Sequence, residues 1–373
     1  MQGAQMPANA IRGIGRWSTE FVLALLRYHP ELVAGISVDP VLPLPGLVSV
    51  LPSHVPLLRS DEAPPGWRDG GVVFHALSPL EDMSLDALWP FWARDPMVGL
   101  TTTLYDMIPL LFPTDYFAGA LKRLLQVRYE LHRQADSVIG ISRTTVDDAV
   151  SLLGLERDRT FVASGGVNGR FRPHELGREG AKQELAASGL QPDFVLTIGN
   201  VDPRKNLRSL VTAYSLLPAE LRKIHQLVIT CSQGDTSYLQ DLIDYAASVG
   251  VRQDVVVYPY VSDELMVLFY QACELMVYPS LYEGLGLPLI EAMASGAAVL
   301  ASDVGPMREI VVDEHARFDP SSVVAISEAL NRMLSDRTTT CRLRKAATRE
   351  AAAHTWKQSI SSAVSAYDVA VRP

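Results

Sequence analysis

Two glutamates eight positions apart, Glu283 and Glu291, lie in the stretch PSLYEGLGLPLIEAMASG at residues 279–296. Carboxylates only accept hydrogen bonds, whereas sugar hydroxyls can donate them. On one continuous helix, eight residues at about 100° each would leave the two side chains about 80° apart. The pair therefore indicates a site for a polyol. For a single glutamate, a helix-dipole partner or a solvated loop residue is the simpler interpretation.

The residues between the glutamates predict a sharp turn that leads into a helix. Pro288 suits the first helical position, where proline gives up no needed N–H donor. Glycines let the backbone turn sharply and approach a ligand, and a helix N-terminus favours an anion. We therefore expect a diphosphate to be bound by the backbone of Gly284, Leu285, Gly286 and Leu287. A site in which glutamates bind hydroxyls and backbone amides bind a diphosphate would fit a sugar nucleotide.

A second cluster, Arg204 and Lys205, follows the predicted strand LTIGN in the sequence DPRKN. A leaving diphosphate gathers negative charge as a glycosidic bond breaks, so positioned cations lower that barrier. A solvated helix start is the alternative interpretation. Because cations at a helix start oppose its dipole, we favour a role in binding phosphate.

These candidate residues must be positioned by the fold of the whole chain, and the composition limits which folds and functions are possible. The chain has 373 residues, too many for one compact core, so two domains are expected. A net charge of −9 argues against nucleic-acid binding. The three cysteines have no metal-ligand spacing, and no Asp-x-Asp pair is present, so we expect no metal and no cofactor. The absence of a long apolar run or a signal core predicts a cytoplasmic protein.

Short β-branched runs alternate with amphipathic stretches, which predicts an α/β fold with parallel sheets. In the first half we expect strands near 33–38, 71–77, 97–105, 137–142 and 159–164, and helices near 16–28, 115–135 and 143–153. In the second half we expect strands at DFVLTIGN, HQLVITCS, DVVVYPY, CELMVYPS and AAVLASDVG. No strand precedes the first helix, so the usual first strand is expected to be missing or truncated.

The predicted elements form two halves, each with its own sheet, and a ligand would bind at the carboxyl ends of the strands. We assign residues 1–180 to a first domain that ends in a Pro- and charge-rich linker from 165. Residues 181–353 form the second domain, and 354–373 form a helix that crosses back to the first.

The stretch VYPSLYEGLGLPLIEAMASGAAVLASDVGPMREIV at 277–311 resembles the donor-binding block of the retaining GT-B glycosyltransferases of family 4. IGNVDPRKNLRSLVTAY, RGIGRWSTEFVLAL, LYDMIPLLFPTDYF and ISRTTVDDAV extend the likeness over most of the chain. The resemblance implies two Rossmann-like domains that face each other across a cleft. It also implies that Glu283 meets hydroxyls of the transferred sugar and Glu291 meets the ribose.

The sequence departs from the family at several positions. Asn200 stands where many members have arginine, and Tyr260 stands where a glycine usually lies near the nucleotide base. Tyr105 and Asp106 replace the frequent His-Asp pair beside the transferred sugar, although relatives with a YD-x-IP form exist. A core tyrosine and a turn-capping aspartate are the structural alternative for this pair.

Two further segments of the first half have candidate roles. By resemblance, GIGRWS at 13–18 is a flexible glycine loop, and Gly15 in it faces the phosphates. The predicted helix near 115–135 is basic and amphipathic, with Lys122, Arg123, Arg128 and Arg133. A solvated helix face is the simpler interpretation of these cations, and contact with a membrane surface or a lipid diphosphate is the alternative.

Together these features predict a retaining, metal-independent transfer of a hexose to a glycan or lipid-linked acceptor in polysaccharide biosynthesis. The YD-x-IP relatives favour mannose from GDP-mannose. We expect a cytoplasmic enzyme with peripheral contact at the inner membrane face. Two alternatives remain open, namely a sugar-nucleotide epimerase with the GT-B fold and an inactive donor-binding partner protein.

Overall fold

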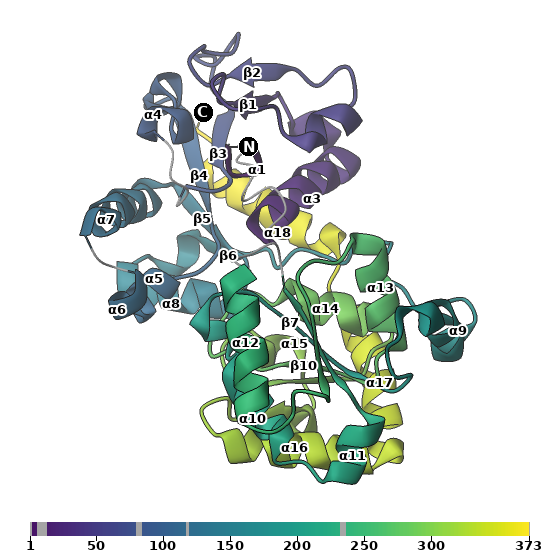
Figure 1. Cartoon of the computed structure of the whole chain (residues 1–373). Helices are drawn as coiled ribbons and strands as arrows, with labels where there is room; N and C mark the ends of the chain where they lie inside the picture. Colours follow the sequence, from purple (N-terminus) through teal and green to yellow (C-terminus); the bar gives the residue numbers. More distant parts are fainter. Residues whose placement is uncertain (1, 6–12, 80–83, 117–118, 232–235, 373) are drawn as a thin grey trace. The chain divides into compact units, whose positions relative to one another are not determined.

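The computed structural model describes residues 2–5, 13–79, 84–116, 119–231 and 236–372. Residue contacts divide the chain into two compact units, Met1–Gly166 with Thr355–Pro373, and Val167–His354. Figure 1 shows the last helix, in yellow, among the purple and blue elements of the first unit. The sequence placed residues 167–180 with the first domain as a linker, whereas in the structure they pack with the second unit.

The first unit is built on a parallel sheet with the strand order β3-β4-β5-β6. Its strands are β3 (Val72–Ala76), β4 (Val98–Leu104), β5 (Ser137–Gly140) and β6 (Thr160–Val162). Every residue of β4 is buried, as expected for a parallel strand that is covered on both faces. Four of the five strands expected in this half therefore form one sheet.

The strand predicted near residues 33–38 exists but lies outside this sheet. β1 (Ile36–Val38) pairs instead with β2 (Leu57–Arg59), a strand that the sequence analysis missed. Each has only three residues, too few for a clear alternation of apolar and polar positions.

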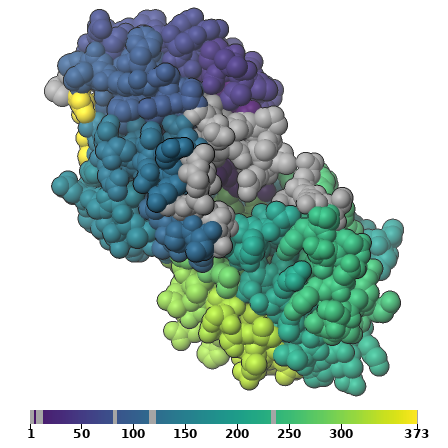
Figure 2. Space-filling view, turned by 60° about the vertical axis from the view of Figure 1, so that its left-hand side comes forward, coloured from purple at the N-terminus to yellow at the C-terminus, as the bar shows by residue number. Residues whose placement is uncertain are grey.

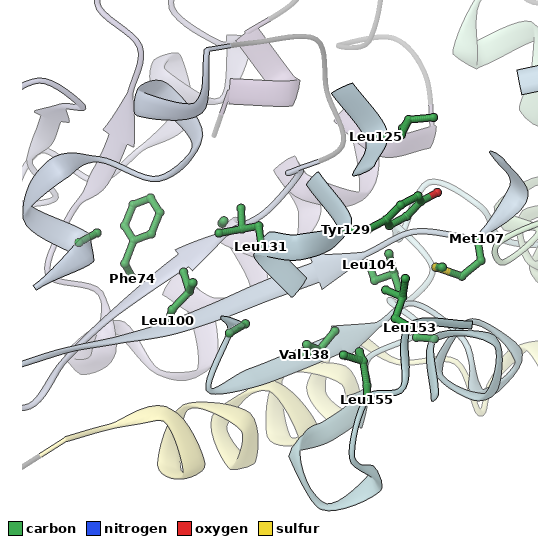
Figure 3. Close-up of a cluster of buried hydrophobic side chains, with 14 of the residues drawn as sticks. Phe74, Leu100, Leu104, Met107, Leu125, Tyr129, Leu131, Val138, Leu153 and Leu155 are labelled. Carbon is green, nitrogen blue, oxygen red and sulfur yellow. The ribbon is translucent and has the colours of Figure 1, made fainter. Parts of the chain in front are cut away.

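Helices cover the sheet of the first unit. They are α1 (Gln2–Gln5), α3 (Gly13–Tyr28), α4 (Leu85–Leu88), α5 (Ile108–Leu111), α6 (Pro113–Tyr116), α7 (Gly119–Gln134), α8 (Arg143–Leu153) and α18 (Trp356–Ala370). Short 3₁₀ turns lie at Pro30–Leu32, Gly46–Val50, Phe91–Arg94 and Arg157–Arg159. Figure 3 shows how Leu100 and Leu104 of β4 and Val138 of β5 pack with Leu131 of α7 and Leu153 of α8.

The basic helix α7 is only partly as expected. Lys122, Arg123 and Arg133 are exposed, which fits a solvated face. Arg128, which the sequence analysis counted with them, is only 2% exposed. The helical repeat turns this residue toward the sheet, so the basic face is smaller than predicted.

The last helix, α18, belongs to the core of the first unit. His75 of β3 bonds to the Tyr367 hydroxyl at 2.8 Å and to Thr103 Oγ1 at 2.8 Å. Burial lowers the pKa of His75 to about 3, so its ring is neutral. The backbone carbonyl of Arg372 accepts a bond from Gly71 N at 2.9 Å. Figure 2 shows the yellow end of the chain against the blue surface of this unit.

We expect Gly99→Ala to destabilise the first unit by about 1–3 kcal/mol, the usual cost of overpacking. A Cβ atom on Gly99 would lie 2.0 Å from the carbonyl oxygen of Ala370, so α18 would have to move. Gly46→Ala is the matched control, because a Cβ there meets nothing within 4 Å. Urea unfolding of both variants measures the difference. Equal midpoints would show that α18 does not depend on this contact.

The second unit contains a six-stranded parallel sheet in the order β12-β11-β10-β7-β8-β9. Its strands are β7 (Val195–Gly199), β8 (Leu227–Cys231), β9 (Val255–Tyr258), β10 (Leu275–Tyr278), β11 (Val299–Ser302) and β12 (Arg317–Phe318). The first five strands were predicted. β12 was missed because two residues have no recognisable periodicity.

The connecting helices of the second unit complete a Rossmann-like arrangement. They are α9 (Gly177–Leu185), α10 (Leu207–Ser215), α11 (Ala219–Ile224), α12 (Thr236–Ser248), α13 (Asp263–Ala272), α14 (Leu287–Ala294), α15 (Met307–Ile310), α16 (Val323–Ser335) and α17 (Arg337–Ala351). Additional 3₁₀ turns lie at Ala186–Ser188, Pro203–Lys205 and Glu314–Ala316.

The strand order reverses between β7 and β10. From β7 the chain proceeds to β8 and β9 on one side, and it then crosses to β10 and β11 on the other. β7 and β10 are neighbours, with Leu275 opposite Val195. In open parallel sheets, ligands bind outside the carboxyl ends of the strands at such a reversal. Both predicted motifs follow these two strands.

Candidate functional site

The loop after β7 is a tight turn that presents two cations. Asn200 Oδ1 accepts a bond from Asp202 N at 3.0 Å, and Asp202 Oδ1 accepts one from Arg204 N at 2.9 Å. These side chains satisfy the backbone donors that would otherwise be free at the start of the 3₁₀ turn Pro203–Lys205. Asn200, expected to contact phosphate, has its carboxamide oxygen in this turn.

The turn is joined to the loop after β10. Asn206, with φ of 58°, donates from Nδ2 to the carbonyl of Pro279 at 3.1 Å. The carbonyl of Arg204 accepts a bond from Leu281 N at 2.7 Å, and Arg204 Nη1 donates to the carbonyl of Tyr282 at 3.1 Å. Arg204 also forms an ion pair with Asp202. Its guanidinium therefore holds the two loops together.

Lys205 and Glu283, predicted from separate motifs, form an ion pair at 2.6 Å between Nζ and Oε1. Their side chains are only 16% and 13% exposed. The Tyr278 hydroxyl lies 3.3 Å from Lys205 Nζ, and the ammonium lies 5.3 Å from the centre of the Tyr278 ring.

The Lys205 ammonium keeps its charge in its partly buried setting. Burial lowers its pKa, but Glu283 and Tyr278 together raise it more, so the net pKa lies above its ordinary value. Burial and the Glu283 carboxylate both raise the pKa of the Tyr278 hydroxyl, which therefore remains protonated. The cluster thus combines a fixed cation, a carboxylate and a neutral hydroxyl donor.

The turn before α14 has the backbone that the glycines predicted. Gly286 has φ of 103° and precedes the first helical residue, Leu287. Gly284 and Leu285 are buried in the turn. Pro288 is the second helical residue instead of the first, a position that also needs no intrahelical N–H bond.

Glu291 lies just over one turn into α14, as predicted, and is 7% exposed. The Tyr270 hydroxyl lies 3.4 Å from its Oε2. No direct bond between Glu291 and the Lys205–Glu283 pair occurs among the described residues. The two glutamates are therefore on the same turn–helix unit, but only Glu283 belongs to the charged cluster.

Tyr260, expected near the nucleotide base, follows β9 and is 54% exposed. The next helix, α13, is capped by Ser262 Oγ, which accepts a bond from Leu265 N at 3.3 Å. The Tyr260 side chain is accessible to solvent, and the structure assigns it no further role.

In the first unit, Tyr105 and Asp106 follow β4, also at a carboxyl strand end. Tyr105 is 5% exposed, and its hydroxyl lies 2.7 Å from Ser18 Oγ. Asp106 Oδ1 accepts a bond from Ile108 N at 2.9 Å, which caps the following turn. These contacts are the ones expected if Tyr105 is a core tyrosine and Asp106 a turn-capping aspartate. They leave the predicted catalytic role of the pair untested.

The glycine loop expected at residues 13–18 is wrong. These residues form the first turns of α3, and Gly15 is buried within the helix. The predicted helix near 16–28 therefore begins three residues earlier, at Gly13. Within it, the Trp17 and Phe21 rings stack with centroids 4.9 Å apart, and Trp17 packs edge-on against Tyr105, with centroids 5.6 Å apart.

The sequence analysis missed Asp202 and Tyr278. Asp202 could have been found as the turn-capping residue of DPRKN, since aspartate commonly caps such turns. Tyr278 was assigned to strand β10 and given no role. Its position as the last residue of that strand, beside Pro279, was the available signal.

Among the described residues, no helix is both long and apolar enough to cross a membrane. The same residues contain no group of three or more histidine, cysteine, aspartate or glutamate side chains placed to hold a metal ion.

Residues 182–351, which include the whole cluster, match the family model "Glycosyl transferases group 1". The chain is 28% identical over 265 residues to the serotype-specific mannosyltransferase WbdA of Escherichia coli, covering 70% of this chain and 32% of WbdA. It is 33% identical over 221 residues to the O-antigen chain mannosyltransferase B of Escherichia coli, covering 57% and 56%. The chain thus spans about a third of WbdA and about half of the second relative.

The solved structure of Anabaena Alr3699/HepE in complex with UDP has a similar fold. It superposes with a TM-score of 0.71 at 17% identity, over 95% of this chain and 96% of that one. At this identity the likeness shows the fold alone. The chain has the GT-B fold with two Rossmann-like domains, and the match of residues 182–351 to the glycosyl transferases group 1 model supports a transferase enzyme.

Proposed function

We propose that the protein is a retaining, metal-independent glycosyltransferase. It moves mannose from GDP-mannose to a glycan or a lipid-linked acceptor, in polysaccharide or glycoconjugate synthesis at the inner face of a membrane. The buried Lys205–Glu283 pair carries the proposal, because it places a cation and a carboxylate at the strand reversal of a glycosyl transferases group 1 domain. The mannosyltransferase names of two relatives support the choice of sugar.

Different site residues bind different parts of the donor. The backbone at Gly284–Leu287 and the Lys205 ammonium bind the diphosphate, whose oxygens accept hydrogen bonds. The Glu283 carboxylate accepts bonds from hydroxyls of the sugar, and Glu291 accepts them from the ribose. Arg204, held by Asp202 and the Tyr282 carbonyl, supports the loop and adds positive charge.

The reaction breaks the bond between the anomeric carbon and the β-phosphate oxygen, and the electron pair stays on that oxygen. Lys205 stabilises the negative charge as it develops, which lowers the barrier. An acceptor hydroxyl attacks the anomeric carbon from the same face, and its proton passes to the departing phosphate oxygen. This route requires no protein base, so Tyr105 in place of histidine is compatible with activity.

A thermal-shift series with GDP-mannose, UDP-glucose, ADP-glucose and dTDP-glucose tests the donor. A ligand that binds only the native state raises the melting temperature. At about one hundred times its dissociation constant, the donor adds about 2.7 kcal/mol to the free energy of unfolding. We expect the largest rise with GDP-mannose.

A larger rise with UDP-glucose would contradict the proposed donor but not the proposed reaction class. Release of the nucleotide diphosphate in the presence of acceptors then tests catalysis. A donor that binds tightly and is never turned over, whichever acceptor is offered, would favour the inactive binding partner.

A further inference from the structure

Tyr278 contacts the proposed catalytic lysine and has no role in the reaction described above. Its side chain is buried, with 1% of the residue exposed, at the carboxyl end of β10. The hydroxyl lies 3.3 Å from Lys205 Nζ, and the ring centre lies 5.3 Å from it, so the ammonium contacts the hydroxyl end of the side chain. The strand is also held beyond the tyrosine, because Ser302 Oγ donates to the Tyr278 carbonyl at 3.2 Å.

The geometry of an ammonium group shows why a second contact matters. Lysine has three N–H donors on a group that rotates freely about its last bond. One donor of Lys205 is bonded to Glu283 Oε1 at 2.6 Å, and a second reaches the Tyr278 hydroxyl. For a given conformation of the methylene stem, one hydrogen bond sets the rotation about the Cε–Nζ bond, and the other two donors follow. With Glu283 alone, a change in the stem would let the ammonium pivot about the Nζ–Oε1 axis and redirect those donors, whereas a second contact to Tyr278 holds the stem as well as the ammonium.

We propose that Tyr278 is a positioning residue that, together with Glu283, orients the third N–H of Lys205 toward the diphosphate of the bound nucleotide. This inference rests on the proposed function, since it requires Lys205 to bind the diphosphate. Tyr278 acts through Lys205 and does not touch the reacting atoms. The hydroxyl carries the effect, because the ammonium lies at the hydroxyl end of the ring and not over its face.

The test compares Tyr278→Phe with Tyr214→Phe. The first substitution keeps the ring and removes only the hydroxyl. Tyr214 is a matched control, since it is 0% exposed in the same unit and its hydroxyl donates to the carbonyl of His225 at 2.7 Å, away from the cluster. Both variants lose one buried hydrogen bond, so thermal melting measures a comparable loss of stability in each.

The main measurement is the dissociation constant for GDP, determined by calorimetry, with UDP measured in parallel. This measurement requires no knowledge of the acceptor. We expect Tyr278→Phe to bind GDP roughly tenfold more weakly, as for one hydrogen bond to a charged group, while Tyr214→Phe binds like the wild type. In a Lys205→Met background, Tyr278→Phe should cause no further loss. With donor and acceptor present, kcat should fall with little change in KM for the donor.

Each outcome decides between the two hypotheses. Equal GDP affinity in Tyr278→Phe and Tyr214→Phe would overturn the positioning role. So would an equal loss from Tyr278→Phe with and without Lys205, because the tyrosine would then act independently of the lysine. Wild-type protein that binds neither nucleotide, or a Lys205→Met variant that binds both normally, would instead reject the proposed function and the inference with it.

Discussion

Lys205→Met should lower kcat by about 10²–10³-fold, the loss seen when one preorganised donor to a developing negative charge is removed. Methionine keeps the length and apolar stem of lysine and removes the ammonium that pairs with Glu283. Because the interaction of Lys205 with phosphate strengthens as the bond breaks, KM for the donor should change less than kcat. Steady-state release of GDP from GDP-mannose measures both constants.

The matched control for this prediction is Lys182→Met. Lys182 is 12% exposed, similar to Lys205, and it pairs with Asp193 at 2.7 Å in the same unit. Both variants lose a partly buried ion pair and should be less stable, Lys182→Met the less so, because Asp193 still pairs with Arg178 at 2.7 Å. Only Lys205→Met should lose turnover. A rise in KM alone, with kcat unchanged, would mean that Lys205 binds donor and transition state equally.

The second large effect is expected from Glu291→Ala, which should weaken donor binding by about 1.5–3 kcal/mol. That range corresponds to roughly 10- to 150-fold in the dissociation constant. The physical reason is that ribose hydroxyls would lose a charged acceptor in a buried position, where Glu291 is 7% exposed. Calorimetric titration with GDP-mannose measures the change.

Tyr270→Phe distinguishes a ribose-binding role of the Glu291 carboxylate from a structural role of the residue. It removes the hydroxyl that lies 3.4 Å from Glu291 Oε2 but keeps the carboxylate and the ring. We expect this variant to bind the donor with nearly wild-type affinity. If it loses as much as Glu291→Ala, the glutamate serves the local structure of α14 and the ribose role is wrong.

The elements of this protein were largely predictable because local rules determine them. Ser142 caps α8, and Gly154 ends it with φ of 69°, so the predicted boundaries 143–153 were correct. Where local rules were insufficient, packing decided. The helix α3 includes the glycine sequence at 13–15, and β1 and β2 were too short to be assigned to a sheet from sequence.

The sequence alone determined which charged residues follow which strands, because a strand end, a glycine turn and a helix cap are encoded by neighbouring residues. It thereby placed Lys205 after β7 and Glu283 before α14. Only the tertiary structure decided that these two residues form one ion pair and that the Tyr278 hydroxyl lies beside it. β7 and β10 are separated by β8 and β9 along the chain yet are adjacent in the sheet. The contact between Lys205 and Glu283 therefore depends on the strand order, which cannot be read from any local pattern of residues.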